Sequence, residues 1–158
     1  KKKDIKILVI PEGILDEIKI LFEYCNNNYN KNIKFTFRLH PIFENNKIVR
    51  NLINSKNIIL SRNSIKHDLL NNEYVLYRGS SLIINAINNG LKPIYLHLSN
   101  EISIDPLFFV NKNYQVFYNQ PLINFLKIKS KKLNNEYKKI REFAIDFYKK
   151  PRYERLIG

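Results

Sequence analysis

Short runs of apolar residues alternate along this chain with longer segments in which apolar residues recur at every third or fourth position. The short runs predict strands at 5–10, 33–39, 57–60, 73–77, 94–96 and 114–118. The spaced segments predict helices at 14–28, 46–54, 64–71, from Ser80 or Ser81 to Asn89, from Pro121 onward, and at 130–150. Strands that alternate with helices predict an α/β fold, a Rossmann-like parallel sheet of about six strands with helices on both faces.

The longest predicted helix, at 130–150, has an apolar face and a basic face. The apolar face consists of Leu133, Tyr137, Ile140, Ala144, and Phe147 or Tyr148. We expect this terminal amphipathic helix to pack on the sheet and to expose the lysines of its other face. Contact with a membrane surface or a partner protein is the alternative that a basic amphipathic helix allows.

The segment at 73–96 predicts a strand, a turn, a helix and a further strand. Gly79 permits the turn, Ser80 or Ser81 is suited to cap the helix, and Gly90 is suited to end it in the left-handed conformation. A helix start with small residues and unpaired donors is also suited to an anion such as phosphate. From this pattern alone, a phosphate site and an ordinary serine-capped connection both stay open.

Composition and charge narrow the possible partners. The length of 158 residues predicts one domain, and 44% hydrophobic residues are enough for a core. A net charge of +13 fits nucleic acid, anionic lipid or a phosphate-bearing substrate. Lysine, asparagine and isoleucine are frequent along the whole chain, which indicates a general bias rather than a basic patch. Nucleic acid is therefore a disfavoured partner.

Cysteine and histidine usage argues against a metal centre. The single cysteine, Cys25, excludes an internal disulfide and a cysteine-based zinc site, and its apolar helical setting predicts a buried thiol. His67 and His97 lack the spacing of metal ligands, so we expect no metal site. The sequence contains neither an 18-residue apolar run nor a signal-peptide pattern, so we expect no membrane span and no signal peptide.

The common strand order 3-2-1-4-5 would make the first and fourth strands neighbours and place a ligand crevice at their carboxyl ends. Three polar loops would meet there, containing Glu12 and Gly13, then Arg38, His40 and Pro41, then Gly79, Ser80 and Ser81. This convergence favours a binding site without naming the ligand.

Individual residues keep alternative roles. His40 is suited either to bind a phosphate or base or to cap a strand end, and we favour binding because His40-Pro41 contributes little to packing. Glu12 is suited equally to accept ribose hydroxyls or to begin a helix. Glu101 is a weaker candidate for the nucleoside or sugar, and for Asp105 we favour a turn with Pro106.

The segment Arg38-Leu39-His40-Pro41, followed by Gly79-Ser80-Ser81 and then by Ala86, Gly90 and Pro93, resembles the C-terminal domain of GT-B glycosyltransferases. It is similar, more narrowly, to bacterial transferases with an HP and an SS motif, of the sialyltransferase, polysialyltransferase or Kdo-transferase type. The resemblance covers most of the chain. It implies that His40 engages the nucleotide of a CMP-sugar and that Ser80 and Ser81 bind its phosphate.

One residue departs from this resemblance. Many related enzymes, and the UDP-GlcNAc 2-epimerases of similar fold, have glutamate where this chain has Asn85, and that carboxylate holds sugar or ribose hydroxyls. Asn85 can donate and accept hydrogen bonds but carries no charge, so it is a weak candidate for ribose or sugar, and ribose recognition would shift to Glu12 or Glu101. The catalytic base of HP/SS transferases lies in their N-terminal domain. The Glu12-Gly13 pair is only superficially similar to that motif, so the catalytic residues are unknown.

The resemblance implies that residues 1–158 form one nucleotide-sugar-binding domain, the donor half of a longer two-domain enzyme. This enzyme would transfer a sugar from a nucleotide-sugar, with a CMP-sugar favoured, to a surface glycan or glycolipid bound by an N-terminal domain, without a metal or other cofactor. We expect a cytoplasmic location, with peripheral contact to the inner face of the membrane as a further option. Two alternatives stay open: a nucleotide-sugar epimerase-like domain, and a non-catalytic domain that binds polyanions such as nucleic acid.

Overall fold

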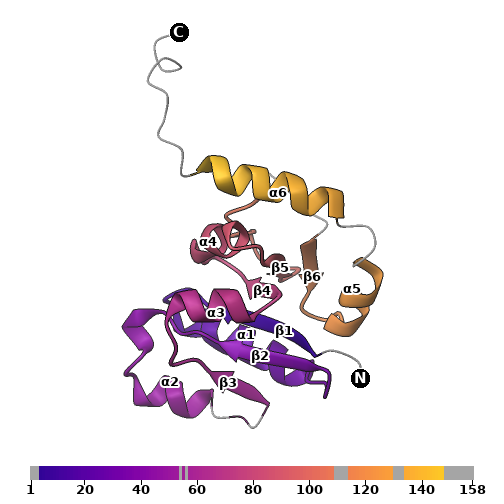
Figure 1. Ribbon diagram of the computed structural model, residues 1–158. Coiled ribbons are helices and arrows are strands. Elements are labelled where there is room, and N and C mark those ends of the chain that lie inside the picture. The colour runs from indigo at the N-terminus through magenta and orange to yellow at the C-terminus, as the bar shows by residue number, and fades with distance from the viewer. Residues whose placement is uncertain (1–3, 54, 56, 109–113, 130–133, 148–158) are drawn as a thin grey trace.

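The computed structural model of this protein describes residues 4–53, 55, 57–108, 114–129 and 134–147. Its strands form one central sheet, and helices cover both faces of that sheet (Figure 1). The sequence prediction of a Rossmann-like α/β fold is therefore confirmed.

The sheet contains six parallel strands in the order β3-β2-β1-β4-β5-β6. The strands are β1 (Ile5–Ile10), β2 (Ile33–Phe37), β3 (Ile58–Leu60), β4 (Tyr74–Tyr77), β5 (Lys92–His97) and β6 (Gln115–Phe117). Every residue of β4 is buried, because a parallel strand between two helix layers has no face in water. The chain reverses its direction of growth between β1 and β4, as the predicted strand order requires.

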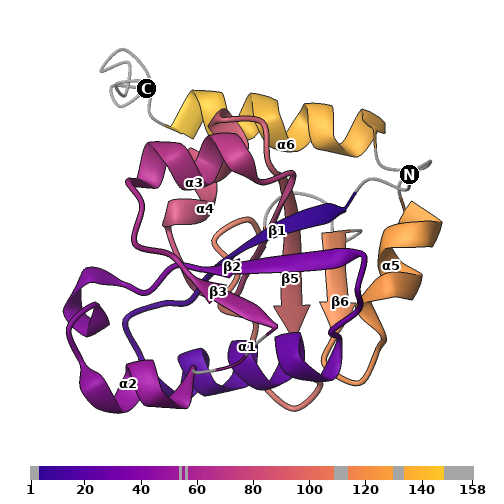
Figure 2. The same ribbon diagram turned by 60° about the horizontal axis from the view of Figure 1, so that its bottom comes forward.

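One face of the sheet is covered by α1 (Leu15–Asn27), α2 (Lys47–Leu52) and α5 (Leu122–Lys129) (Figure 2). Ile18 and Leu21 of α1 pack with Phe35 and Phe37 of β2 in a common apolar cluster. Cys25 is fully buried in the same cluster, so its thiol is a core group, as predicted.

The opposite face is covered by α3 (Ile65–Asn71), α4 (Leu82–Asn88) and α6 (Asn134–Phe147) (Figure 2). Ile140 and Ala144 of α6 are buried in the cluster formed with α4, so this helix packs on the sheet layer as predicted. Phe147 is exposed instead, with its ring 6.0 Å from that of Phe143. Leu133, Tyr148 and both ends of the predicted helix lie outside the described residues.

The boundaries of several elements differ from the sequence prediction. β2 ends at Phe37, because the chain turns after His40 into a short 3₁₀ helix, η1 (Pro41–Phe43). β5 begins early, at Lys92, since Lys92 and Pro93 still lie in register with β4. Gly90 has a φ of 90°, which confirms the predicted left-handed end of α4. None of the described helices is both long enough and apolar enough to cross a membrane.

Candidate functional site

Three loops meet at the carboxyl edge of the sheet, where β2, β1 and β4 lie side by side. Ile10 at the end of β1 is in register with Tyr77 at the end of β4, and Val9 is in register with Phe37 at the end of β2. The segments that follow these strands therefore emerge next to one another. They contain Glu12 and Gly13, then Arg38 to Pro41, then Gly79 to Ser81.

A cleft of about 390 Å³ lies among these loops. Its walls are formed by Ile10, Pro11, Arg38, Leu39, His40, Pro41, Ile65, Ser80, Ser81, Leu82 and Asn85. The walls thus combine apolar side chains from β1, α3 and α4 with polar side chains, a combination found in small-molecule sites. Of the predicted site residues, Glu12, Gly13, Gly79 and Glu101 are not among those that form these walls.

His40 is exposed, and a backbone contact orients its ring. The backbone N–H of Ile42 donates to His40 Nδ1 at 3.3 Å. Because Nδ1 accepts this bond, the neutral ring carries its proton on Nε2, where it is a donor for a ligand. Pro41 follows at the start of η1, a position that requires no N–H donor. His40 therefore caps a turn and offers a donor at the same time.

The serine pair offers hydroxyl groups that the described part of the fold does not use. Ser81 is the N-cap residue of α4, one of the two positions predicted, but its side chain makes no capping hydrogen bond. The cap is made by backbone instead, since Ile83 donates to the carbonyl of Ser80 and Ile84 to that of Ser81, each at 3.2 Å. Because α4 has only seven residues, we take the two hydroxyls, rather than a helix dipole, as the relevant donors.

Two glycines allow the loop after β1 to contact both of its neighbours. A Cβ atom at Gly79 would collide with the carboxylate of Glu12 and would lie 3.1 Å from Ile104 Cδ1. A Cβ atom at Gly13 would lie 3.3 Å from Nδ1 of His40. Because Gly79 has no side chain, Glu12 lies against the loop of Ser80 and Ser81. Because Gly13 has none, it lies against His40.

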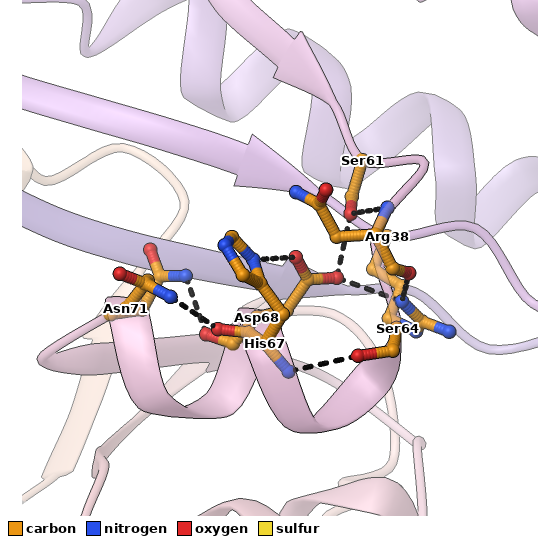
Figure 3. Close-up of polar contacts among 8 residues, drawn as sticks. Arg38, Ser61, Ser64, His67, Asp68 and Asn71 are labelled. Atoms are coloured by element: carbon orange, nitrogen blue, oxygen red, sulfur yellow. Dashed lines mark hydrogen bonds and ion pairs between the residues drawn. The ribbon is translucent and has the colours of Figure 1, made fainter.

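Arg38 reaches the cleft wall but is held by an aspartate. Its Nη1 donates to Asp68 Oδ2 and to the carbonyl of Asn63, both at 2.8 Å (Figure 3). Asp68 is 1% exposed and also accepts a hydrogen bond from Ser61 Oγ at 2.7 Å. Asp68 balances the positive charge of Arg38. In the cleft, Arg38 therefore contributes hydrogen-bond donors, its Nε and Nη2, rather than a net positive charge.

Arg78 is a structural centre of this edge that the sequence reasoning missed. It is 1% exposed, and its Nε donates to Glu17 of α1. Its Nη1 donates to the carbonyl of Leu96 at 3.0 Å, and its Nη2 donates to Glu101 at 2.7 Å. Arg78 therefore ties α1, the end of β5 and the loop after β5 to the loop that contains Gly79. The sequence signal for this role of Arg78 is an arginine placed directly between a buried strand and a glycine.

The loop after β5 is anchored by a second buried group. Asp105 accepts hydrogen bonds from the hydroxyls of Tyr77 at 2.8 Å and Tyr114 at 2.7 Å, and from the N–H of Leu107 at 2.9 Å. Burial raises the pKa of Asp105 above its ordinary value, against the lowering effect of these three bonds. The turn role predicted for Asp105 is confirmed, whereas the ribose or sugar role of Glu101 stays a prediction.

The part of the chain that the structure describes contains no cluster of side chains suited to a metal ion. No group of three or more histidine, cysteine, aspartate or glutamate side chains lies there in a position to hold an ion. His67 is exposed beside Asp68, and His97 packs edge-on against Phe117, with ring centres 5.0 Å apart. That the protein functions without a metal or other cofactor stays a prediction.

Comparisons with known proteins bear on the fold. The sequence matches no protein-family model and no curated protein. Structures of the spinosyn rhamnosyltransferase SpnG, with and without spinosyn aglycone, match with a TM-score of 0.61 and 11% identity, over 92% of this chain and 42% of theirs. A putative UDP-N-acetylglucosamine 2-epimerase from Listeria monocytogenes matches with a TM-score of 0.52 and 10% identity, over 87% of this chain and 40% of that one.

These likenesses show the fold alone, which matches one half of the GT-B fold. The chain spans about two fifths of the length of these solved structures. They give no support to the narrower resemblance to HP/SS-motif transferases, which stays a hypothesis.

Proposed function

We propose that this chain is the donor-binding domain of a glycosyltransferase and that it binds a nucleotide-sugar, with a CMP-sugar favoured, in the cleft between β1 and β4. The proposal depends on one observation above all. His40 and the hydroxyls of Ser80 and Ser81 approach one cleft from two loops, and the described fold leaves the His40 Nε2 donor and both hydroxyls unpaired. The chain's likeness to one half of a GT-B enzyme supports the proposal.

In this function the cleft residues bind the leaving nucleotide. Ser80 and Ser81 would donate to a phosphate oxygen, and the Nε2 donor of His40 would contact the nucleotide. As the bond to the sugar breaks, negative charge grows on that phosphate. Donors that are already in position stabilise this charge without having to reorganise. The base that activates the acceptor would come from a second domain, which would also bind the acceptor, a surface glycan or glycolipid.

Titration calorimetry with CMP, CDP, UDP, GDP and their sugar conjugates tests the proposal. We expect saturable binding, with CMP or a CMP-sugar the tightest ligand. The double variant Ser80→Ala, Ser81→Ala should weaken that binding about tenfold or more, since a hydrogen bond to a charged group contributes about 1.5–3 kcal/mol. Because the Ser81 hydroxyl makes no capping bond, the variant should fold normally, which circular dichroism checks.

The matched control is the double variant Lys138→Gln, Lys139→Gln on the exposed face of α6. It removes two positive charges from a helix that contributes no residue to the walls of the cleft. Nucleotide affinity should therefore change less than twofold, which corresponds to about 0.4 kcal/mol. A larger loss of affinity in the lysine variant than in the serine variant would show that overall charge, rather than the cleft, binds the nucleotide.

Titrations with nucleotide-sugars and with polynucleotides, and a product assay, separate the two rival functions. Preference for UDP-N-acetylglucosamine over every CMP compound, followed by formation of its 2-epimer, would favour an epimerase. Binding of single-stranded polynucleotides of any sequence, with steep loss at higher salt, would favour a polyanion-binding domain. The cytoplasmic location and the peripheral membrane contact belong to the transferase proposal, and sedimentation of the chain with anionic vesicles tests the contact.

A further inference from the structure

A second cavity, of about 260 Å³, lies beside the donor cleft and shares Arg38 and Leu39 with it. It is formed by the ends of β2 and β3 and by the segment that leads into α2. Its walls consist of Arg38, Leu39, Glu44, Asn45, Arg50, Leu60, Ser61, Arg62 and Asn63. Three of these residues are arginines and one, Glu44, is acidic, so arginines predominate among the charged residues of the lining.

The guanidinium groups retain donors that no contact in the described residues occupies. Arg50 uses its Nε for the carbonyl of Glu44, at 2.6 Å, which leaves its two Nη groups. Arg62 is exposed and makes no hydrogen bond or ion pair with the described part of the chain. Arg38 uses Nη1 and keeps Nε and Nη2. The charges of Arg50 and Arg62 are thus not balanced by any of the ion pairs that the described residues form.

The buried carboxylate of Asp68 holds one wall of this cavity in position before any ligand binds. Arg38 and Ser61 both donate to Asp68 Oδ2, so the ends of β2 and β3 are held together from α3 (Figure 3). The Ser61 hydroxyl also accepts from the N–H of Asn63 at 3.2 Å, which orders the turn that carries Arg62. Arg62 therefore extends from a turn whose backbone is held by hydrogen bonds.

We propose that this cavity binds one oxyanion, a phosphate or a carboxylate group, at a site that adjoins the donor cleft along Arg38 and Leu39. Guanidinium groups present flat pairs of N–H donors that match the oxygen pairs of these two anions. The cavity is smaller than most sites for whole cofactors, so a single anionic group is the ligand class that fits. Arg50 and Arg62 supply the charge, and Arg38 supplies donors on the shared wall.

Nuclear magnetic resonance on the 158-residue chain tests this site through the arginine Nε–Hε signals. Inorganic phosphate and D-glucuronate are the two anionic probes, and D-glucose is the neutral one. We expect saturable shifts of the Arg50 and Arg62 signals with at least one anion and none with glucose. Saturation by phosphate alone identifies phosphate as the ligand group, and saturation by glucuronate alone identifies carboxylate.

The variant Arg62→Gln decides whether the arginine cavity is the site. It should weaken binding of the active anion about tenfold, because it removes a charged hydrogen-bond donor. The matched control Arg141→Gln, on α6, should change affinity less than twofold, and the Ser80→Ala, Ser81→Ala variant should do the same. The proposal is overturned if no anion saturates, or if Arg62→Gln weakens binding no more than Arg141→Gln does. Binding lost only in the serine variant would place the anion in the donor cleft and would leave the proposed transferase function intact.

Discussion

Arg78 shows how one side chain can hold a whole edge of this sheet. Its guanidinium is buried, yet all three of its nitrogens donate to oxygens from other parts of the chain. A buried charge is tolerated only when it is paired and hydrogen-bonded. The two carboxylates that pair with it, Glu17 and Glu101, differ in burial, since the side chain of Glu101 is 51% exposed. Glu17 is therefore the partner that would suffer most from the loss of Arg78.

The variant Arg78→Met should destabilise the protein by about 3 kcal/mol, because it leaves Glu17 and the carbonyl of Leu96 without their buried donor. Urea unfolding at pH 7 measures the change. Arg141→Met, an exposed arginine on α6, is the matched control and should stay within about 0.5 kcal/mol of the parent protein. Equal stability of the two variants would contradict the anchoring role of Arg78.

Asp105 makes stability depend on pH in an unusual direction for an acid. Its pKa in the folded state is raised above the ordinary value of 3.8, mainly by burial. The folded protein therefore holds this proton more strongly than the unfolded chain does. Its contribution to stability should fall as the pH rises from about 4 through the raised pKa.

Urea unfolding of the parent and of Asp105→Asn, at several values between pH 4 and pH 7, measures this dependence. Asparagine cannot ionise, so the stability of the parent relative to the variant should decrease as the pH rises. A relative stability that increases over this range would show that the hydrogen bonds from Tyr77 and Tyr114 outweigh burial.

At the residue scale, the sequence indicated the positions of His40, Ser80 and Ser81 because each follows the end of a strand. It did not indicate the pairs Arg38–Asp68 and Arg78–Glu17, which join residues far apart in the chain. Such pairs depend on how helices pack on the sheet, and a single sequence does not contain that information. The sequence also indicated unpaired donors at the start of α4, and in the structure the side chain of Ser81 makes no capping hydrogen bond.

At the element scale, apolar periodicity located every strand but not every boundary. β5 extends back to Lys92 because pairing with β4 continues through Pro93. Proline is rare inside strands, so local propensity placed the start too late. β2 ends early because the turn at His40 leads into η1. In both places the neighbouring elements determine the boundary.

The end of α4 depends on Gly90, whose φ of 90° is costly for any residue with a side chain. The variant Gly90→Ala should lose about 1–2 kcal/mol of stability, measured by urea unfolding. A Cβ at this position would meet nothing within 4 Å, so the loss would come from the backbone alone. Gly90→Asn should lose less, because asparagine tolerates the left-handed region better. A smaller loss for alanine than for asparagine would contradict this account.

At the scale of the whole molecule, the alternation of strands and helices was enough to predict the sheet order. Right-handed crossovers and short connections leave few arrangements for such a chain, and the structure adopts the common one. The ligand was not predictable in the same way. A cleft at the strand reversal is a property of the fold, whereas the choice of ligand depends on the particular side chains that line the cleft.

The isolated 158-residue chain should unfold in one cooperative transition and should have no sugar-transfer activity. A single sheet with two apolar clusters is sufficient for a stable core, while no catalytic base has been identified in the cleft. Incubation with CMP-sugars and oligosaccharide acceptors, followed by chromatography of the products, measures transfer. Efficient transfer by this chain alone would show that the catalytic residues lie within it.

The place where β1 meets β4 also affects how the protein folds. Strands β1, β2 and β3 pair with neighbours close in the chain, as do β4, β5 and β6, whereas the β1–β4 pairing joins residues 7 and 74. That contact closes the longest loop in the sheet, so its entropy cost exceeds that of the other pairings by about 1 kcal/mol, and we expect it to form after them. The proposed donor cleft lies on this same seam. A nucleotide would therefore bind only chains in which folding is complete, and its binding would slow their unfolding.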